Sequence, residues 1–272
     1  MAAVMKPELN PSLVDIRLFD SHCHLDLPEL WPDCQQHWQQ AQAVGVKGCL
    51  IPAVQASAWQ PLLEFARKHT DFNIALGIHP WWASKHDETS LQQLKSLLEQ
   101  HQSQITAVGE IGLDYALAPE TFARQQQLFE AQLKLAAEFQ KPVVLHHRKS
   151  MVQLLAEIKR QQFQYGGILH AFSGSPEQGQ VFVDLGFKLG IGGTITYARA
   201  AKTQQAVRRL PLSCFVLETD APSLPLSGFQ GQINTPKQLA LVFQAFCELR
   251  KEAPFEIAQQ LWRNTQAALL IQ

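Results

Sequence analysis

Two histidines separated by a single residue give the sharpest chemical signal in this sequence. They lie in Asp20-Ser21-His22-Cys23-His24, directly after a short apolar run. In an extended chain, residues i and i+2 point to the same face, so His22 and His24 can reach one metal ion while Cys23 points away. A lone His-x-His pair is more often two histidines on a half-exposed strand. The motif therefore needs support from elsewhere in the chain.

Four further residues of metal-ligand type each end or follow an apolar run, namely Glu110, His146, His170 and Asp220. Together with His22 and His24 they make a donor set of imidazole and carboxylate without thiolate. Such a set is typical of a catalytic site for Zn²⁺, Mn²⁺ or Mg²⁺ with open coordination positions, and it argues against a closed structural zinc site.

Four histidines and two carboxylates are more ligands than one tetrahedral ion uses. They favour a pair of divalent ions about 3.5–4 Å apart, which can lower the pKa of bound water from ~15.7 to ~7 and clamp both oxygens of a phosphoester. Glu110 is the natural bridge between the two ions. Asp220 can ligate one of them and act as general base towards the attacking water. Glu110 and Asp220 are therefore the predicted catalytic residues.

Short apolar runs alternate with longer helical patterns along the whole chain, which predicts a parallel α/β fold. The expected strands are Val14–Phe19, Gly48–Ile51, Asn73–Leu76, Ala107–Ile111, Val143–His146, Gly167–His170, Lys188–Ile191 and Phe215–Leu217. The expected helices include Asp33–Val44, Ala58–His69, Ser90–Gln100, Thr121–Phe139, Met151–Gln161, Thr235–Glu248 and Pro254–Leu269, with Asp33 and Ser90 as N-caps.

Eight such strands with crossover helices favour a (β/α)8 TIM barrel, in which all six ligand-type residues converge on the C-terminal rim. A doubly wound open sheet is the alternative, but no Gly-x-Gly-x-x-Gly motif follows the first strand. The chain has 272 residues, and it carries no linker, repeat or low-complexity tract. A single domain over residues 1–272 is the economical interpretation, since α/β barrels routinely use about 250 residues.

Composition excludes several classes of protein. Hydrophobic residues make up 46% and charged residues 17% of the chain, as in folded globular proteins. The net charge of −1 provides no general basic field, so any nucleic acid must be held locally. The five cysteines form no Cys-x-x-Cys pair, residues 1–10 do not resemble a signal peptide, and no apolar run has membrane-spanning length. We expect a cytoplasmic protein.

The motifs, taken in order, resemble the TatD family of metal-dependent deoxyribonucleases, and nearly the whole chain takes part in the resemblance. Gly192–Tyr197 and Gly228–Gln232 are more specifically similar to its YjjV branch. The family motifs are Asp20–Asp26, Gly109–Tyr115, Lys141-Pro142 with His146-x-Arg148, His170-x-Phe172-Ser173-Gly174, and Glu218-Thr219-Asp220-x-Pro222.

The resemblance implies an amidohydrolase-like TIM barrel with two divalent ions. It places His22, His24 and Asp220 on one ion, His146 and His170 on the other, and Glu110 between both. It also implies 3′→5′ exonuclease activity on DNA, with single strands or 3′ ends as substrate and no obligate protein partner. The chain departs from the family at Lys149 and at Gln232–Pro236, which leaves the metal ligands intact and bears on substrate preference.

Residues beside the ligands are candidates for substrate contacts. His79, in Gly77-Ile78-His79-Pro80, could contact a phosphate oxygen or be hydrogen-bonded within the rim, and Arg148 could donate to phosphate or form a salt bridge. Trp81, Trp82 and Phe229 could stack on bases or pack beneath their own loops. His147 should point away from the site, because adjacent strand residues face opposite sides.

Two other functional classes remain open. The first is a binuclear metallohydrolase that cleaves a small-molecule amide, lactone or phosphoester. The second is a catalytically inactive binding or scaffold protein, which would be expected to have lost some of the ligands; all six are present, which argues against it.

Overall fold

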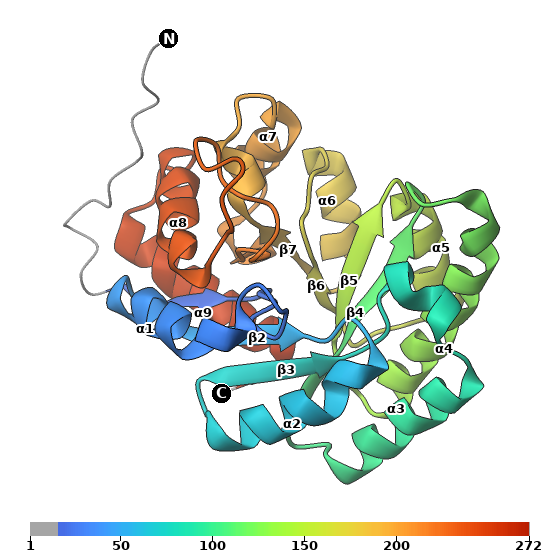
Figure 1. The fold of residues 1–272 in the computed structure, drawn as a ribbon. Coiled ribbons are helices and arrows are strands. Elements are labelled where there is room, and N and C mark those ends of the chain that lie inside the picture. The colour runs from blue at the N-terminus through green and yellow to red at the C-terminus, as the bar shows by residue number, and fades with distance from the viewer. Residues whose placement is uncertain (1–15, 272) are drawn as a thin grey trace. The chain divides into compact units, whose positions relative to one another are not determined.

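The computed structural model describes residues 16–271, in which strands and helices alternate (Figure 1). The expectations for residues 1–10 and for the start of the Val14–Phe19 run fall outside this range. The strands are β1 (Leu18–Asp20), β2 (Val46–Pro52), β3 (Phe72–Leu76), β4 (Ile105–Asp114), β5 (Val143–Arg148), β6 (Gly167–Leu169), β7 (Phe187–Ile191) and β8 (Phe215–Leu217).

All eight strands belong to one sheet in the order β1-β2-β3-β4-β5-β6-β7-β8. Neighbours such as β4 and β5 pair in parallel, with Gly112 opposite His146 and Asp114 opposite Arg148. This sequential order confirms the (β/α)8 fold and excludes the doubly wound alternative, in which the strand order reverses at a switch point. The carboxyl ends of parallel strands lie at the same edge of the sheet, where the ligand-type residues were expected.

The helices follow the expected pattern with two additions that were not predicted, α6 (Pro176–Val183) and α7 (Ala201–Arg209). Asp33 occupies the N-cap of the first helix without a side-chain capping bond. The prediction that Ser90 caps a helix is wrong: Asp87 is the N-cap, and its Oδ1 accepts from the amides of Thr89 and Ser90. The helices are α1 (Cys34–Ala43), α2 (Trp59–Lys68), α3 (Glu88–Gln100), α4 (Phe122–Glu138), α5 (Met151–Arg160), α6 (Pro176–Val183), α7 (Ala201–Arg209), α8 (Leu239–Glu248) and α9 (Pro254–Leu269).

Contacts within the chain define two compact units. Unit 1 consists of residues 16–49, 171–181 and 189–265, and unit 2 of residues 50–170, 182–188 and 266–271. In unit 2, helices α2 to α5 cover the strands β3, β4 and β5 (Figure 1). In unit 1, the amide of Ser21 donates to Leu217 O, which joins the end of β1 to the end of β8.

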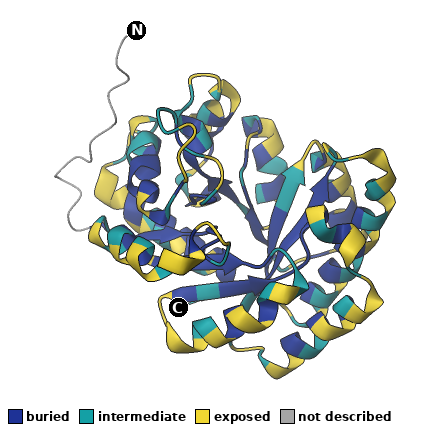
Figure 2. Cartoon of the chain, in the orientation of Figure 1, coloured by how far each residue is buried: buried dark blue, intermediate teal, exposed yellow. Residues whose placement is uncertain are grey.

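The strands are buried almost throughout, whereas the outer helix faces are exposed (Figure 2). Strand β8 has no exposed residue, and β4 is buried except at one intermediate position. This near-continuous burial is typical of parallel strands that are covered on both faces. No disulfide joins the five cysteines, all of which lie in the described range. Within residues 16–271, no helix is long and apolar enough to cross a membrane.

Candidate metal-binding site

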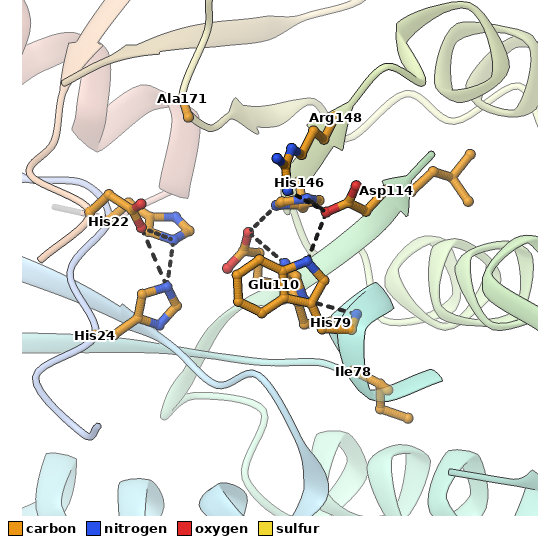
Figure 3. A network of polar contacts seen from close by, with 12 residues as sticks. His22, His24, Ile78, His79, Glu110, Asp114, His146, Arg148 and Ala171 are labelled. Atoms are coloured by element: carbon orange, nitrogen blue, oxygen red, sulfur yellow. Dashed lines mark hydrogen bonds and ion pairs between the residues drawn. The ribbon is translucent and has the colours of Figure 1, made fainter. Parts of the chain in front are cut away.

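The first group of ligand-type residues lies in unit 1, where His22, His24 and Asp220 meet. The two Nε2 atoms are 3.0 Å apart, and each lies 3.6 Å from Asp220 Oδ1. All three residues are buried. Figure 3 shows the imidazole rings of His22 and His24 edge to face, with their nitrogens turned towards each other. Two facing imidazole nitrogens beside a carboxylate are an arrangement that a cation would satisfy.

Backbone pairing, rather than a regular strand, brings the two histidines together. Strand β1 ends at Asp20, so His22 and His24 lie beyond it. The amide of Asp220 donates to His22 O at 2.9 Å, and that of His24 donates to Ala221 O at 2.8 Å. These bonds follow the one from the Ser21 amide to Leu217 O, which joins the ends of β1 and β8. The predicted convergence of His22 and His24 is therefore found, although its cause differs from strand alternation.

The buried carboxylate of Asp20 links the two chain segments that form this group. Asp20 Oδ1 accepts from the amides of Thr219 and His22, at 2.9 and 3.3 Å, and its Oδ2 accepts from the Thr219 hydroxyl at 2.6 Å. Complete burial raises the pKa of Asp20 to about 7, although these hydrogen bonds act in the opposite direction. Asp20 therefore connects the segment that contains His22 with the segment that contains Asp220. Asp20 belongs to the Asp20–Asp26 motif, but this role was not predicted for it.

The second group lies in unit 2, around Glu110 on β4. His146 Nδ1 is 3.0 Å and His79 Nε2 3.5 Å from Glu110 Oε1 (Figure 3). The other imidazole nitrogen of His146, Nε2, is 3.3 Å from Asp114 Oδ2. Burial lowers the pKa of His146, but the hydrogen bonds to Asp114 and Glu110 outweigh it, so the net shift is upwards. His146 thus lies between two carboxylates.

Strand register explains this second group. Gly112 and Asp114 alternate along β4, and Gly112 pairs with His146 on β5, whereas Glu110 lies between Val108 and Ile111, where the register shifts. Gly112 has φ of +145°, and a Cβ at this position would collide with the carbonyl oxygen of His146. Only glycine permits this close approach of the two strands. The neighbouring His147 pairs with Leu113, in the opposite alternation, as expected.

Asp114 is a site residue that the sequence analysis did not select. Its Oδ2 accepts from Trp81 Nε1 at 2.7 Å and from His146, and its Oδ1 accepts from the amide of Ala116. Burial opposes its charge, but these hydrogen bonds lower the pKa of Asp114 to about 2. The available signal was its spacing of four from Glu110, which places both carboxylates on one face of an extended strand.

Hydrogen bonding defines the protonation of His79. Its Nδ1 accepts from the amide of Trp81 at 3.1 Å, so in the neutral imidazole the proton resides on Nε2. That Nε2–H faces Glu110. This tautomer favours His79 as a hydrogen-bond donor, although His79 also forms a group with Glu110 and His146 whose ligand atoms could hold a metal ion. A contact between His79 and the substrate stays a prediction.

Three more predicted residues have defined places in the fold. His170 follows β6, is buried, and its amide donates to Leu145 O, next to His146. Arg148 has a side chain that is 59% exposed, and its guanidinium is 4.0 Å from Asp114 Oδ2. Trp81 is 57% exposed while its indole N–H is committed to Asp114. Arg148 and Trp81 are therefore open to solvent at the edge of the second group.

Two buried glutamines of α4 hold the backbone of this group. Gln125 Oε1 accepts from the amide of Asp114, and its Nε2 donates to Asp114 O. Gln132 forms the equivalent pair with Ile78, the residue before His79. The two glutamines are seven residues apart, or two helical turns, and so lie on the same face of α4.

Comparison with known proteins places these residues in a family context. A family model described as TatD related DNase matches residues 19–269. The protein named "Uncharacterized metal-dependent hydrolase YjjV" from Escherichia coli K12 is 45% identical over 249 residues, which cover 92% of this chain and 96% of that protein. An "Uncharacterized metal-dependent hydrolase" from Haemophilus influenzae is 40% identical over 257 residues, covering 92% and 98%.

Solved structures agree with these matches. The crystal structure of E. coli YjjV, described as a TatD homologue, superimposes with a TM-score of 0.91 at 44% identity, over 94% of this chain and 99% of that one. A TatD family hydrolase from Entamoeba histolytica gives a TM-score of 0.81 at 18% identity, covering 95% and 100%, a likeness that concerns the fold alone.

Proposed function

Since the chain belongs to the TatD-related DNase family of metal-dependent hydrolases, on its YjjV branch, we propose that it cleaves phosphodiester bonds of DNA. The observation that carries this proposal is the buried convergence of His22, His24 and Asp220, in which two imidazole nitrogens and a carboxylate oxygen face one another. We further propose 3′→5′ exonuclease action on single strands or 3′ ends, which the family resemblance implies.

The donor atoms fit divalent ions. Three ligand atoms lie within 4.8 Å of one another in the group His22, His24 and Asp220 and in the group His79, Glu110 and His146, and none is a thiolate. We assign one ion to His22, His24 and Asp220 and a second to Glu110, His146 and His170, as Zn²⁺, Mn²⁺ or Mg²⁺. Glu110 as a bridge between the two ions stays a prediction. When bound, such ions lower the pKa of water and polarise the phosphoryl oxygen.

Side chains of the protein carry out the proton transfer, hold the ligands in place and bind the phosphate. Asp220 acts as general base and takes the proton from the attacking water. His146 offers Nδ1 on the side of Glu110, while its Nε2–H donates to Asp114, an arrangement that fixes the orientation of the imidazole. His79 Nε2–H and the exposed guanidinium of Arg148 donate to the non-bridging phosphate oxygens.

One experiment separates this function from a small-molecule hydrolase of the same family. The purified protein is analysed for bound metal and assayed on single-stranded DNA labelled at the 3′ or the 5′ end, and on a panel of esters, lactones and amides. Release of the 3′ label first supports the proposal. Turnover of a small ester or amide with intact DNA overturns it, and release of the 5′ label first refutes the polarity alone.

A further inference from the structure

A pocket of about 610 Å³ opens in unit 1, and none of the residues assigned above lines it. Its walls come from the loop after β7 and the start of α7, which supply Thr194, Tyr197, Arg199 and Lys202, and from the loop after β8, which supplies Leu224 and Pro225. This volume lies within the ~300–1,000 Å³ of small-molecule sites. Thr194 and Tyr197 also belong to the Gly192–Tyr197 motif, to which the proposed function gives no role.

The pocket is positively charged although the whole protein is not. Arg199 and Lys202 line it, and no carboxylate does. Within residues 16–271 neither cation forms an ion pair, whereas Arg209 at the other end of α7 is 3.2 Å from Glu177. The Arg199 guanidinium lies 4.8 Å from the centre of the Tyr197 ring. A pocket with these walls favours an anion over a neutral or cationic ligand.

Hydrogen bonds hold the two walls to each other. The Tyr197 hydroxyl donates to Pro225 O at 2.8 Å, and the Thr196 hydroxyl accepts from the amide of Ser227 at 2.8 Å. Gln204, one turn into α7, donates to Ile195 O at 2.9 Å. The pocket is therefore built into the fold rather than left between loose loops.

The chain connects this pocket directly to the first metal-binding group. Leu224 follows Asp220 by four residues, and the amide of Ser223 donates to Asp220 O at 2.7 Å. Four residues span at most ~14 Å even when fully extended. The wall of the pocket at Leu224 therefore lies close in space to Asp220, and so does a ligand bound against it.

We infer that this pocket holds the nucleotide next to the cleaved phosphodiester, an inference that rests on the proposed function. Arg199 and Lys202 bind its phosphate, while Tyr197, Leu224 and Pro225 contact its sugar and base. The pocket makes the enzyme specific for nucleotide chains over isolated phosphodiesters. It also explains how a chain of net charge −1 holds a polyanion through a small local site.

The test compares two substrates with one pair of variants. Arg199→Gln/Lys202→Gln removes both pocket cations, and Arg208→Gln/Arg209→Gln removes two charges from the far end of the same helix. Each protein is assayed on a single-stranded octadeoxythymidylate and on bis(4-nitrophenyl) phosphate. Charge-assisted hydrogen bonds contribute enough that the pocket variant should lose about tenfold or more in kcat/KM on the octamer, mainly through KM. The pocket variant should hydrolyse the small diester at a rate within about twofold of the wild-type rate. The control variant should stay within about twofold of wild type on both substrates.

The outcomes are distinguishable. A pocket variant that loses nothing on the octamer, or loses equally on both substrates, overturns the inference. If the wild-type protein cleaves neither substrate, the proposed function fails, and octamer binding measured by fluorescence anisotropy then decides about the pocket. Wild-type binding should weaken about tenfold in the pocket variant, and the slope of log K against log salt should become shallower by ~1.4. Unchanged or undetectable binding overturns the inference in that case too.

Discussion

The side-chain amide of Gln125 pairs with both backbone groups of Asp114, as a neighbouring strand would. Gln125 Oε1 accepts from the Asp114 amide at 2.8 Å, and Nε2 donates to Asp114 O at 3.1 Å. The end of β4 is thereby fixed from helix α4. The carboxylate that it carries receives His146 Nε2–H, so a helix residue outside the site determines how a proposed ligand is oriented.

Replacing this glutamine should therefore lower the stability of the protein. Gln125→Leu leaves the backbone groups of Asp114 buried without partners, which should lower the free energy of unfolding by ~1–3 kcal/mol. Gln127→Leu, at an exposed position on the same helix, should change it by less than ~0.5 kcal/mol. Urea unfolding of the two variants measures the difference, and equal effects would show that the amide pair is not stabilising.

Gly112→Ala should disturb the pairing of β4 with β5. The added Cβ meets the carbonyl oxygen of His146, so the strands must separate. Gly231→Ala is the matched control, because Gly231 also has a positive φ, +80°, and no atom within 4 Å of the added Cβ. A backbone conformation unfavourable to alanine costs ~1–3 kcal/mol in both proteins. Thermal unfolding should show a clearly larger loss for Gly112→Ala, and similar losses would rule out the steric cause.

His146→Ala and His147→Ala should differ sharply in turnover. His146 lies between Glu110 and Asp114, whereas His147 has the opposite alternation on β5. Loss of a residue that orients a metal ligand lowers activity about 10–100-fold, so loss of the ligand itself should cost at least about a hundredfold. The His147 variant should retain most activity. Steady-state assays on DNA measure the turnover of both variants. Equal losses of turnover in the two variants would contradict the assignment of His146.

Chelation should abolish hydrolysis without unfolding the protein. The proposed ligands are imidazoles and carboxylates, and added Mn²⁺, Mg²⁺ or Zn²⁺ should restore turnover. The fold should persist because a chain of this length buries roughly three quarters of its unfolded surface without metal. Circular dichroism of the chelated protein tests the fold separately. Full activity with no detectable metal would refute the proposed chemistry.

Stability should also depend on pH through Glu252. Hydrogen bonding from Arg250 lowers the pKa of Glu252 to about 2, and the same Arg250 donates to Val207 O and Leu210 O near the end of α7. Because the folded pKa is depressed, the stabilisation is present above the unfolded pKa near 4.5 and is lost as pH falls towards 2.

Glu252→Gln should therefore lower the melting temperature at pH 7 by more than at pH 3. Solvent screening keeps the effect small, since the Glu252 side chain is 34% exposed. Glu120→Gln, at an exposed position, is the control. A melting-temperature difference for Glu252→Gln that stays constant over this pH range would contradict the ion-pair explanation.

The sequence by itself predicted the strands, their order and five ligand-type residues of the two groups, but not Asp114. Strand β8 has the predicted bounds. Five ligand-type residues lie within or after the expected apolar runs, namely His22, His24, Glu110, His146 and Asp220. This was possible because burial on both faces imposes continuous apolar runs, and a parallel sheet brings the carboxyl ends of its strands to one edge.

Tertiary structure decided which atoms meet. Asp114 orients His146, His79 carries its proton on Nε2, and Gln132 holds Ile78 from a position 54 residues away in the chain. None of these contacts leaves a local pattern, because each depends on strand register and on how a helix packs against the sheet. Hydrogen bonds require alignment within a few tenths of an ångström, and only the folded chain provides it.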